Sequence, residues 1–153
     1  MIKLSKLTDY SVAILAQMSK ADTGKVVSCT FLSETTGVPE PTVAKILKIL
    51  TKSGFVVSAR GIRGGYRLDR SADKITVADI ITAMDGPIAV TACVEGGTND
   101  CAMESKCPVR GNWDKVNRAI RAALEEVSLA DIAATPPCQV MSVTAFGVET
   151  KRA

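Results

Sequence analysis

The order of helix-forming and chain-breaking residues between 30 and 53 most constrains the fold of this chain. A short helix is predicted over residues 30–36, and the segment Gly37-Val-Pro-Glu-Pro41 ends it. A second helix is predicted from Pro41 to Ser53, because proline is tolerated in a first turn, where its missing N–H costs nothing. Two helices joined by a short turn containing glycine, the second of them basic, form a helix-turn-helix pattern.

A glycine- and arginine-rich hairpin follows this pattern directly. Predicted strands at 55–60 and 66–69 flank the tip Gly61-Ile-Arg-Gly-Gly65. A hairpin in this position is the wing of a winged helix. We therefore expect a mainly α fold with a small β-hairpin wing.

Further helices are predicted on both sides of this unit. Residues 9–20 show a helical apolar pattern that Thr8 or Asp9 can cap, and residues 75–84 begin with Thr76 and Asp79 at capping-box spacing. A long C-terminal helix is predicted over 109–127. Apolar residues recur on it at spacings of three and four, which indicates a dimerisation seam formed by Trp113, Val116, Ile120, Ala123 and Val127. The alternative is that this face packs on its own domain.

Charge is distributed unevenly along the chain. Residues 1–75 hold 12 Lys and Arg against 6 Asp and Glu, whereas residues 76–153 hold 7 against 10. A basic N-terminal half suggests a polyanion partner, double-stranded DNA, and a solvated basic face is the alternative. The DNA-contacting side chains would come from the second helix of the pattern and from the wing: Thr42, Lys45, Lys48, Arg60 and Arg63.

Three cysteines, Cys93, Cys101 and Cys107, lie in a loop that is rich in Gly, Asn and Asp. Closely spaced thiolates are soft ligands that suit zinc, Cu(I) or an iron–sulfur cluster. Buried free thiols and a structural zinc are the alternatives, although the gaps differ from the usual paired zinc spacing. Cys29 is expected to be a small core residue.

Composition excludes several other classes. The chain contains no histidine, so no Cys–His or Ser–His nucleophile pair is possible, and we expect no enzyme. No apolar run reaches the roughly 20 residues that span a bilayer. The N-terminus lacks a signal-peptide core, and a cytoplasmic protein without a membrane partner is expected.

Four segments carry a resemblance to a known family. They are Leu7-Thr-Asp-Tyr-Ser-Val-Ala13, the wing from Val57 to Leu68, Ile75-Thr-Val-Ala-Asp-Ile-Ile81, and the three cysteines followed by a Trp-bearing helix. Over residues 1–132 the chain resembles the IscR/NsrR-type (Rrf2) winged-helix regulators, and among them regulators of iron–sulfur assembly systems.

The resemblance implies a homodimeric DNA-binding transcriptional regulator, expected to be a repressor of iron–sulfur assembly or stress genes. It implies an iron–sulfur cluster on Cys93, Cys101 and Cys107, with a two-iron (2Fe–2S) form favoured and a four-iron (4Fe–4S) form possible. Some members take the fourth ligand from a histidine three residues beyond the third cysteine, where this chain has Arg110. Others use a carboxylate from the first helix of the partner subunit, a position that Asp9 matches. The first two cysteines are two residues further apart than in the commonest family pattern.

Several alternatives stay open. Asp9 could instead be a helix cap, in which case Cys138, Glu95 or Glu104 would supply the fourth ligand. The regulator could be a winged helix that uses thiol–disulfide chemistry without a cluster, and a small iron–sulfur electron-transfer protein is a further alternative. The expected domains are a winged helix-turn-helix unit (1–87), a cluster-binding loop (88–108), dimerisation helices (109–134) and a flexible tail (135–153).

Overall fold

The computed structural model describes residues 4–21, 25–61, 64–103, 106–109 and 111–134. Within them the chain forms α1 (Lys6–Ser19), α2 (Cys29–Thr36), α3 (Glu40–Lys52), the strands β1 (Val56–Ala59) and β2 (Gly65–Leu68), a 3-10 turn η1 (Ala72–Lys74), α4 (Val77–Asp85), α5 (Asn112–Glu125) and α6 (Leu129–Ala134). The mainly α fold with a hairpin wing is confirmed.

Helix α1 lies at the centre of the fold and contacts α2, α3, α4, α6 and β2. It begins earlier than the apolar pattern predicts. Ser5 is its N-cap and accepts a hydrogen bond from the Thr8 N–H at 3.1 Å, so neither Thr8 nor Asp9 has the capping role. Its buried face includes Ile14, Leu15 and Met18, whereas Ala13 is exposed.

Within the helix-turn-helix pair, glycine ends the first helix and prolines stand at the start of the second. Gly37 adopts a left-handed conformation (φ 72°) and caps α2, and Pro39 and Pro41 stand at the start of α3. Helix α3 buries one apolar face, formed by Val43, Ile46, Leu47 and Leu50. Burying this row fixes which side of α3 faces outward.

The wing is a two-stranded antiparallel hairpin in which Val56 pairs with Leu68 and Ala59 with Gly65. Val27 adds a bridge to it, because its N–H donates to the Tyr66 carbonyl at 2.9 Å and its carbonyl accepts from the Tyr66 N–H at 2.8 Å. A Cβ at Gly65 would collide with the Val27 carbonyl oxygen, so only glycine fits at this position. The hairpin is thereby fixed to the segment that precedes α2.

The predicted capping box at the start of α4 is confirmed. Thr76 accepts from the Asp79 N–H at 3.1 Å, and the Asp79 carboxylate accepts from the Thr76 N–H at 3.1 Å. After α5 the chain returns to this point: the Val77 N–H donates to the Val127 carbonyl, and the Leu129 N–H donates to the Ile75 carbonyl. Leu129 is fully buried in the same core as Ile14 and Leu15.

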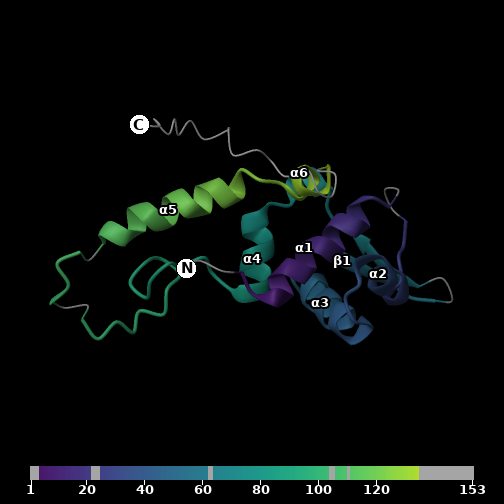
Figure 1. The fold of residues 1–153 in the computed structure, drawn as a ribbon, viewed down its shortest axis with the longest axis horizontal. Coiled ribbons are helices and arrows are strands. Elements are labelled where there is room, and N and C mark those ends of the chain that lie inside the picture. Colours follow the sequence, from purple (N-terminus) through teal and green to yellow (C-terminus); the bar gives the residue numbers. More distant parts are fainter. Residues whose placement is uncertain (1–3, 22–24, 62–63, 104–105, 110, 135–153) are drawn as a thin grey trace, which may run out of the picture.

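Figure 1 shows α5 as a separate rod that runs beside α4, with the segment between α4 and α5 projecting at the end of the molecule far from α2. This segment contains the three cysteines of the cysteine loop (residues 88–108). The fold therefore places the cysteine loop and the helix-turn-helix pair at opposite ends of the molecule.

Candidate DNA-binding face and cysteine loop

Three of the residues expected to contact DNA lie on the outward side of α3. Lys45 and Lys48 are exposed and Thr42 is half-buried, opposite the buried apolar row of the helix. Within the described part of the chain neither lysine is held in an ion pair, so both ammonium groups are available to phosphates.

Of the two wing arginines expected to contact DNA, the structure describes one. Arg60 follows β1 directly and is exposed, whereas Arg63 lies outside the described residues. Arg70, at the far end of the hairpin, stacks its guanidinium 5.1 Å from the centre of the Phe55 ring. Arg70 therefore stabilises the base of the wing through this contact.

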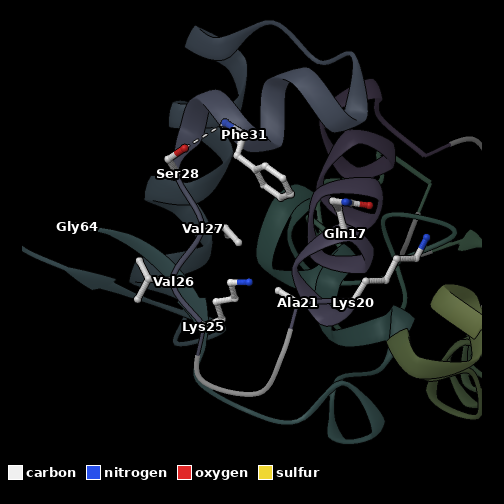
Figure 2. Close-up of a pocket in the computed structure, with 9 residues that line it drawn as sticks. All are labelled: Gln17, Lys20, Ala21, Lys25, Val26, Val27, Ser28, Phe31 and Gly64. Atoms are coloured by element: carbon white, nitrogen blue, oxygen red, sulfur yellow. Dashed lines mark hydrogen bonds between the residues drawn. The ribbon is translucent and has the colours of Figure 1, made fainter. Parts of the chain in front are cut away.

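A hollow of about 470 Å³ lies between the end of α1, the start of α2 and the wing strand, and sequence reasoning missed it. Figure 2 shows Phe31 and Gln17 facing it from two helices, with the Lys25 ammonium group in its middle. Ser28 caps α2 by accepting from the Phe31 N–H at 3.1 Å. Lys25 lies on the segment before α2, and Lys20 lines the opposite side of the hollow from Gly64 (Figure 2). Only the fold reveals this grouping, because Gln17 and Gly64 are far apart in the sequence.

The cysteine loop holds its three thiols half-buried and free of disulfides. The Cys93 sulfur lies 3.4 Å from the Thr91 hydroxyl oxygen. Within the described residues no group of three Cys, Asp or Glu side chains is close enough to hold a metal ion. The donor chemistry fits an iron–sulfur cluster, since thiolates are its usual ligands, but a single chain in this conformation does not bring three of them together.

Cys29 differs from the loop cysteines. It packs half-buried against the hydrophobic core, and burial together with the nearby Glu40 carboxylate raises the pKa of its thiol, against a hydrogen bond with Tyr66. A thiol that stays protonated is a poor metal ligand and nucleophile. The prediction of a small core residue is consistent with this position.

Asp9 lies in the first turn of α1 and is exposed. Its backbone N–H bonds to the Ser5 carbonyl, and its carboxylate has no hydrogen bond or ion pair with any other described residue. Asp9 is thus not engaged in capping. The carboxylate is free to bind a group from outside the chain. Of the other candidate ligands, Glu95 is exposed in the loop, and Glu104 and Cys138 lie outside the described residues.

Helix α5 exposes most of its apolar seam. Trp113, Val116 and Ala123 are exposed and Ile120 is half-buried, while Val127, also exposed, lies two residues beyond the end of α5. Asn117 is the one buried residue of this helix.

A helix-turn-helix pair whose outward side is basic, followed by a hairpin wing, defines a winged-helix DNA-binding protein. Residues 4–135 match the Rrf2 family, described as an iron-dependent transcriptional regulator. The chain belongs to the Rrf2 family. It is a DNA-binding transcriptional regulator, and the expectation that it is no enzyme is confirmed by this membership.

Individual relatives agree with the family. An HTH-type transcriptional regulator of Mycobacterium tuberculosis is 31% identical over 133 residues, which cover 86% of this chain and 81% of that protein. The structure of CymR, the global cysteine regulator of B. subtilis, is similar with a TM-score of 0.70 at 28% identity, covering 87% of this chain and 97% of that one. T. potens IscR is similar with a TM-score of 0.64 at 28% identity, covering 86% and 85%. Among the described helices none is long and apolar enough to cross a membrane.

Proposed function

We propose that this chain is a homodimeric iron–sulfur-cluster-sensing repressor of iron–sulfur assembly or stress genes, acting in the cytoplasm. The observation that carries the proposal is the gathering of three free, half-buried thiols in one loop of an Rrf2 regulator. Such a regulator needs a chemical signal that reaches DNA binding, and no other described segment concentrates reactive side chains in this way.

DNA binding is proposed to use α3 in the major groove and the wing on the adjacent backbone. Thr42, Lys45 and Lys48 would reach base edges and phosphates from α3, while Arg60 and Arg63 would bind from the wing. Lys25, on the segment before α2, adds a positive charge. The exposure of Lys45, Lys48 and Arg60 supports this assignment.

A homodimer is proposed to form through α5. Trp113 and Val116 are neighbours on one face of α5 and are each 42% exposed, and Val127, just beyond the end of the helix, is 39% exposed. Two copies joined along this seam would bury these side chains. They would also present two α3 helices to half-sites about one helical turn apart.

The cluster is proposed to bind through Cys93, Cys101 and Cys107, with Asp9 of the partner subunit as the fourth ligand. A bound cluster supplies redox chemistry and reactivity toward oxygen and nitric oxide. We favour the two-iron form. The free carboxylate of Asp9 supports its role, because a carboxylate committed to capping would be a poorer candidate. Since α1 packs directly on α3, a ligand on α1 would connect the state of the loop with the DNA-binding helices.

The proposed domains keep the boundaries expected from the sequence: a DNA-binding unit (1–87), the cluster-binding loop (88–108), the dimerisation helices (109–134) and the tail (135–153), which lies outside the described residues.

The decisive experiment is anaerobic purification followed by absorption and EPR spectra, with iron and sulfide counted per chain. A brown protein with iron and sulfide is expected. Replacing Cys93, Cys101 or Cys107 by Ser should abolish or destabilise the cluster, while Cys29→Ser is the matched control and should keep it. Full occupancy in the Cys101→Ser protein would refute the proposed ligand set.

Asp9 is tested by Asp9→Asn. Asn keeps the size and hydrogen-bonding capacity of Asp but lacks its anionic oxygen. We expect an unchanged fold and dimer with a labile cluster or an altered spectrum. A normal cluster with normal oxygen sensitivity would move the fourth-ligand role to Cys138, Glu95 or Glu104.

A thiol–disulfide switch without a cluster is the second candidate function. It is favoured by one observation, that no three candidate ligands lie together in the described chain. It also agrees with the likeness to CymR, a global cysteine regulator. Anaerobic protein that is colourless and free of iron, yet changes its DNA affinity on thiol oxidation, would establish it. An electron-transfer protein does not agree with membership of a family of transcriptional regulators.

A further inference from the structure

The end of α4, from which the chain enters the cysteine loop, is hydrogen-bonded to α1. Asp85, the last residue of α4, accepts a hydrogen bond from the Thr8 hydroxyl at 2.7 Å and one from the Ser5 N–H at 3.4 Å. The Ser5 and Thr8 hydroxyl oxygens are themselves 3.0 Å apart. We call this contact between Asp85 and the start of α1 the α1 joint. Thr8 is fully buried, so water cannot replace its hydrogen bond to the Asp85 carboxylate unless the α1 joint opens. Asp85 therefore connects the end of α4 with the first turn of α1, the turn that carries Asp9.

A second attachment joins the loop to α5. The side chain of Asn117, only 5% exposed, donates from Nδ2 to the Ile88 carbonyl at 3.0 Å and accepts at Oδ1 from the Val90 N–H at 3.1 Å. An amide can do both at once, which neither a carboxylate nor an apolar side chain can. Because Cys93 lies only three residues beyond Val90, Asn117 fixes the base from which the first thiol projects.

Space remains between these two attachments. A groove of about 400 Å³ is lined by Asp85, the segment 86–90, Leu4 and Ile81, and by Ile120 and Leu124 of α5. Gly86 begins the segment with φ at 93°, a conformation that residues with a Cβ rarely adopt. The segment thus borders an open groove, and hydrogen bonds at its two ends connect it to α1 and to α5.

We propose that Asp85 and Asn117 are positioning residues that couple the cysteine loop to α1 and to α5, so that a change at the cysteines alters how the DNA-binding helices are presented. The proposal rests on the proposed function only in assuming that the state of the cysteines controls DNA binding. Neither residue touches DNA or a ligand. Their effect runs through the two hydrogen-bonded joints.

The test uses the full chain and a DNA duplex selected by the wild-type protein from a random-sequence library. Dissociation constants are measured by fluorescence anisotropy in two states, with the thiols reduced and metal-free, and as isolated anaerobically. For colourless protein, modification with N-ethylmaleimide replaces the second state. The ratio of the two constants is the coupling, which for linked sites is typically about 5–150-fold.

Thr8→Val, Asp85→Ala and Asn117→Ala are expected to bring this ratio below about twofold while the reduced proteins keep wild-type affinity, because each removes one partner of a hydrogen-bonded joint. Thr8→Ser keeps the hydroxyl and should keep the ratio. Asn112→Ala, an exposed Asn on the same helix, is the matched control for Asn117, and Asp73→Asn controls for the loss of charge at Asp85.

A wild-type ratio in Thr8→Val and Asn117→Ala would overturn the proposal and leave both residues with a structural role alone. Hydrogen exchange separates this result from failure of the proposed function. Modification of the thiols should change exchange at amides in the first turns of α1 in the wild type but not in Thr8→Val. If the wild-type protein itself shows a ratio of one, the proposed function fails. Hydrogen exchange alone then decides whether the two joints couple the cysteine loop to α1 and α5. Asp85→Ala, at an exposed residue, keeps the test valid should Thr8→Val or Asn117→Ala fail to fold, and a wild-type ratio in it would likewise overturn the proposal.

Discussion

The double substitution Lys45→Ala with Arg60→Ala tests the proposed DNA face most directly. Both side chains are exposed, one on α3 and the other at the end of β1, and neither is ion-paired within the described residues. Their removal should therefore change the free energy of unfolding little and should lower the affinity for DNA.

The expected change in the salt dependence of DNA affinity follows from the number of cations removed. A homodimer with both substitutions loses four cations. Because each phosphate contact contributes about 0.9 to the slope of log affinity against log salt, the slope should fall by about 3.6 if all four bind phosphates. If Lys45 instead binds a base, the slope should fall by about 1.8, and discrimination at one base position should weaken by about 1–3 kcal/mol.

The assay is fluorescence anisotropy with a selected duplex over a series of salt concentrations, together with duplexes that carry single-base changes. Lys74→Ala is the matched control, since Lys74 is an exposed lysine on η1, which packs against α6. An unchanged affinity and slope in the double variant would refute the docking, as would an equal loss in the control.

Three further perturbations test the packing, the dimer and the α1 joint. Leu129→Ala removes a fully buried side chain and should lower the free energy of unfolding by about 2–5 kcal/mol in urea denaturation, an outcome that wild-type stability would contradict. Val116→Asp places a charge in the exposed seam of α5 and should shift the chain from dimer to monomer in sedimentation velocity; a persistent dimer would exclude this seam. Although burial opposes ionisation of Asp85, hydrogen bonds from Thr8 and Ser5 hold the pKa of this carboxyl below its ordinary value. Its stabilising effect should be complete above the unfolded pKa of about 3.9 and be lost as the pH falls through the lower folded pKa. The urea midpoints of wild type and Asp85→Asn should therefore converge in acid, and a constant difference would argue against this linkage.

Local chemistry explains which parts of the fold could be predicted from the sequence. The capping box of Thr76 and Asp79 and the chain break at Gly37 depend on residues only a few positions apart, and each lies where expected. The predicted start of α1 was wrong because its first two turns bury Thr8 and Ser11, polar residues that an apolar pattern cannot detect. Their burial depends on hydrogen bonds, among them the bond from Thr8 to Asp85, 77 positions away.

The candidate site also has features that the local sequence predicts and features that only the fold reveals. The order of α3 and the wing, with their exposed cations, follows from local pattern, as does the concentration of cysteines in one loop. The Asn117 attachment and the hollow lined by Lys25 bring together residues from separate elements, so no local sequence pattern indicates either. A ligand from the partner subunit, as proposed for Asp9, is a property of an assembly rather than of one chain's local sequence.

The return of the chain after α5 has a consequence for how such proteins diversify. The cysteine loop and α5 leave the core at the end of α4, and the chain returns to the start of the same helix, where the Val77 N–H donates to the Val127 carbonyl at 2.9 Å. Topologically, the cysteine loop and α5 are an insertion that begins at one end of α4 and closes at the other. An insertion of this kind can be lengthened, shortened or exchanged while the surrounding core, including Leu129, keeps its shape. One DNA-reading framework can in this way acquire different sensors without a new fold.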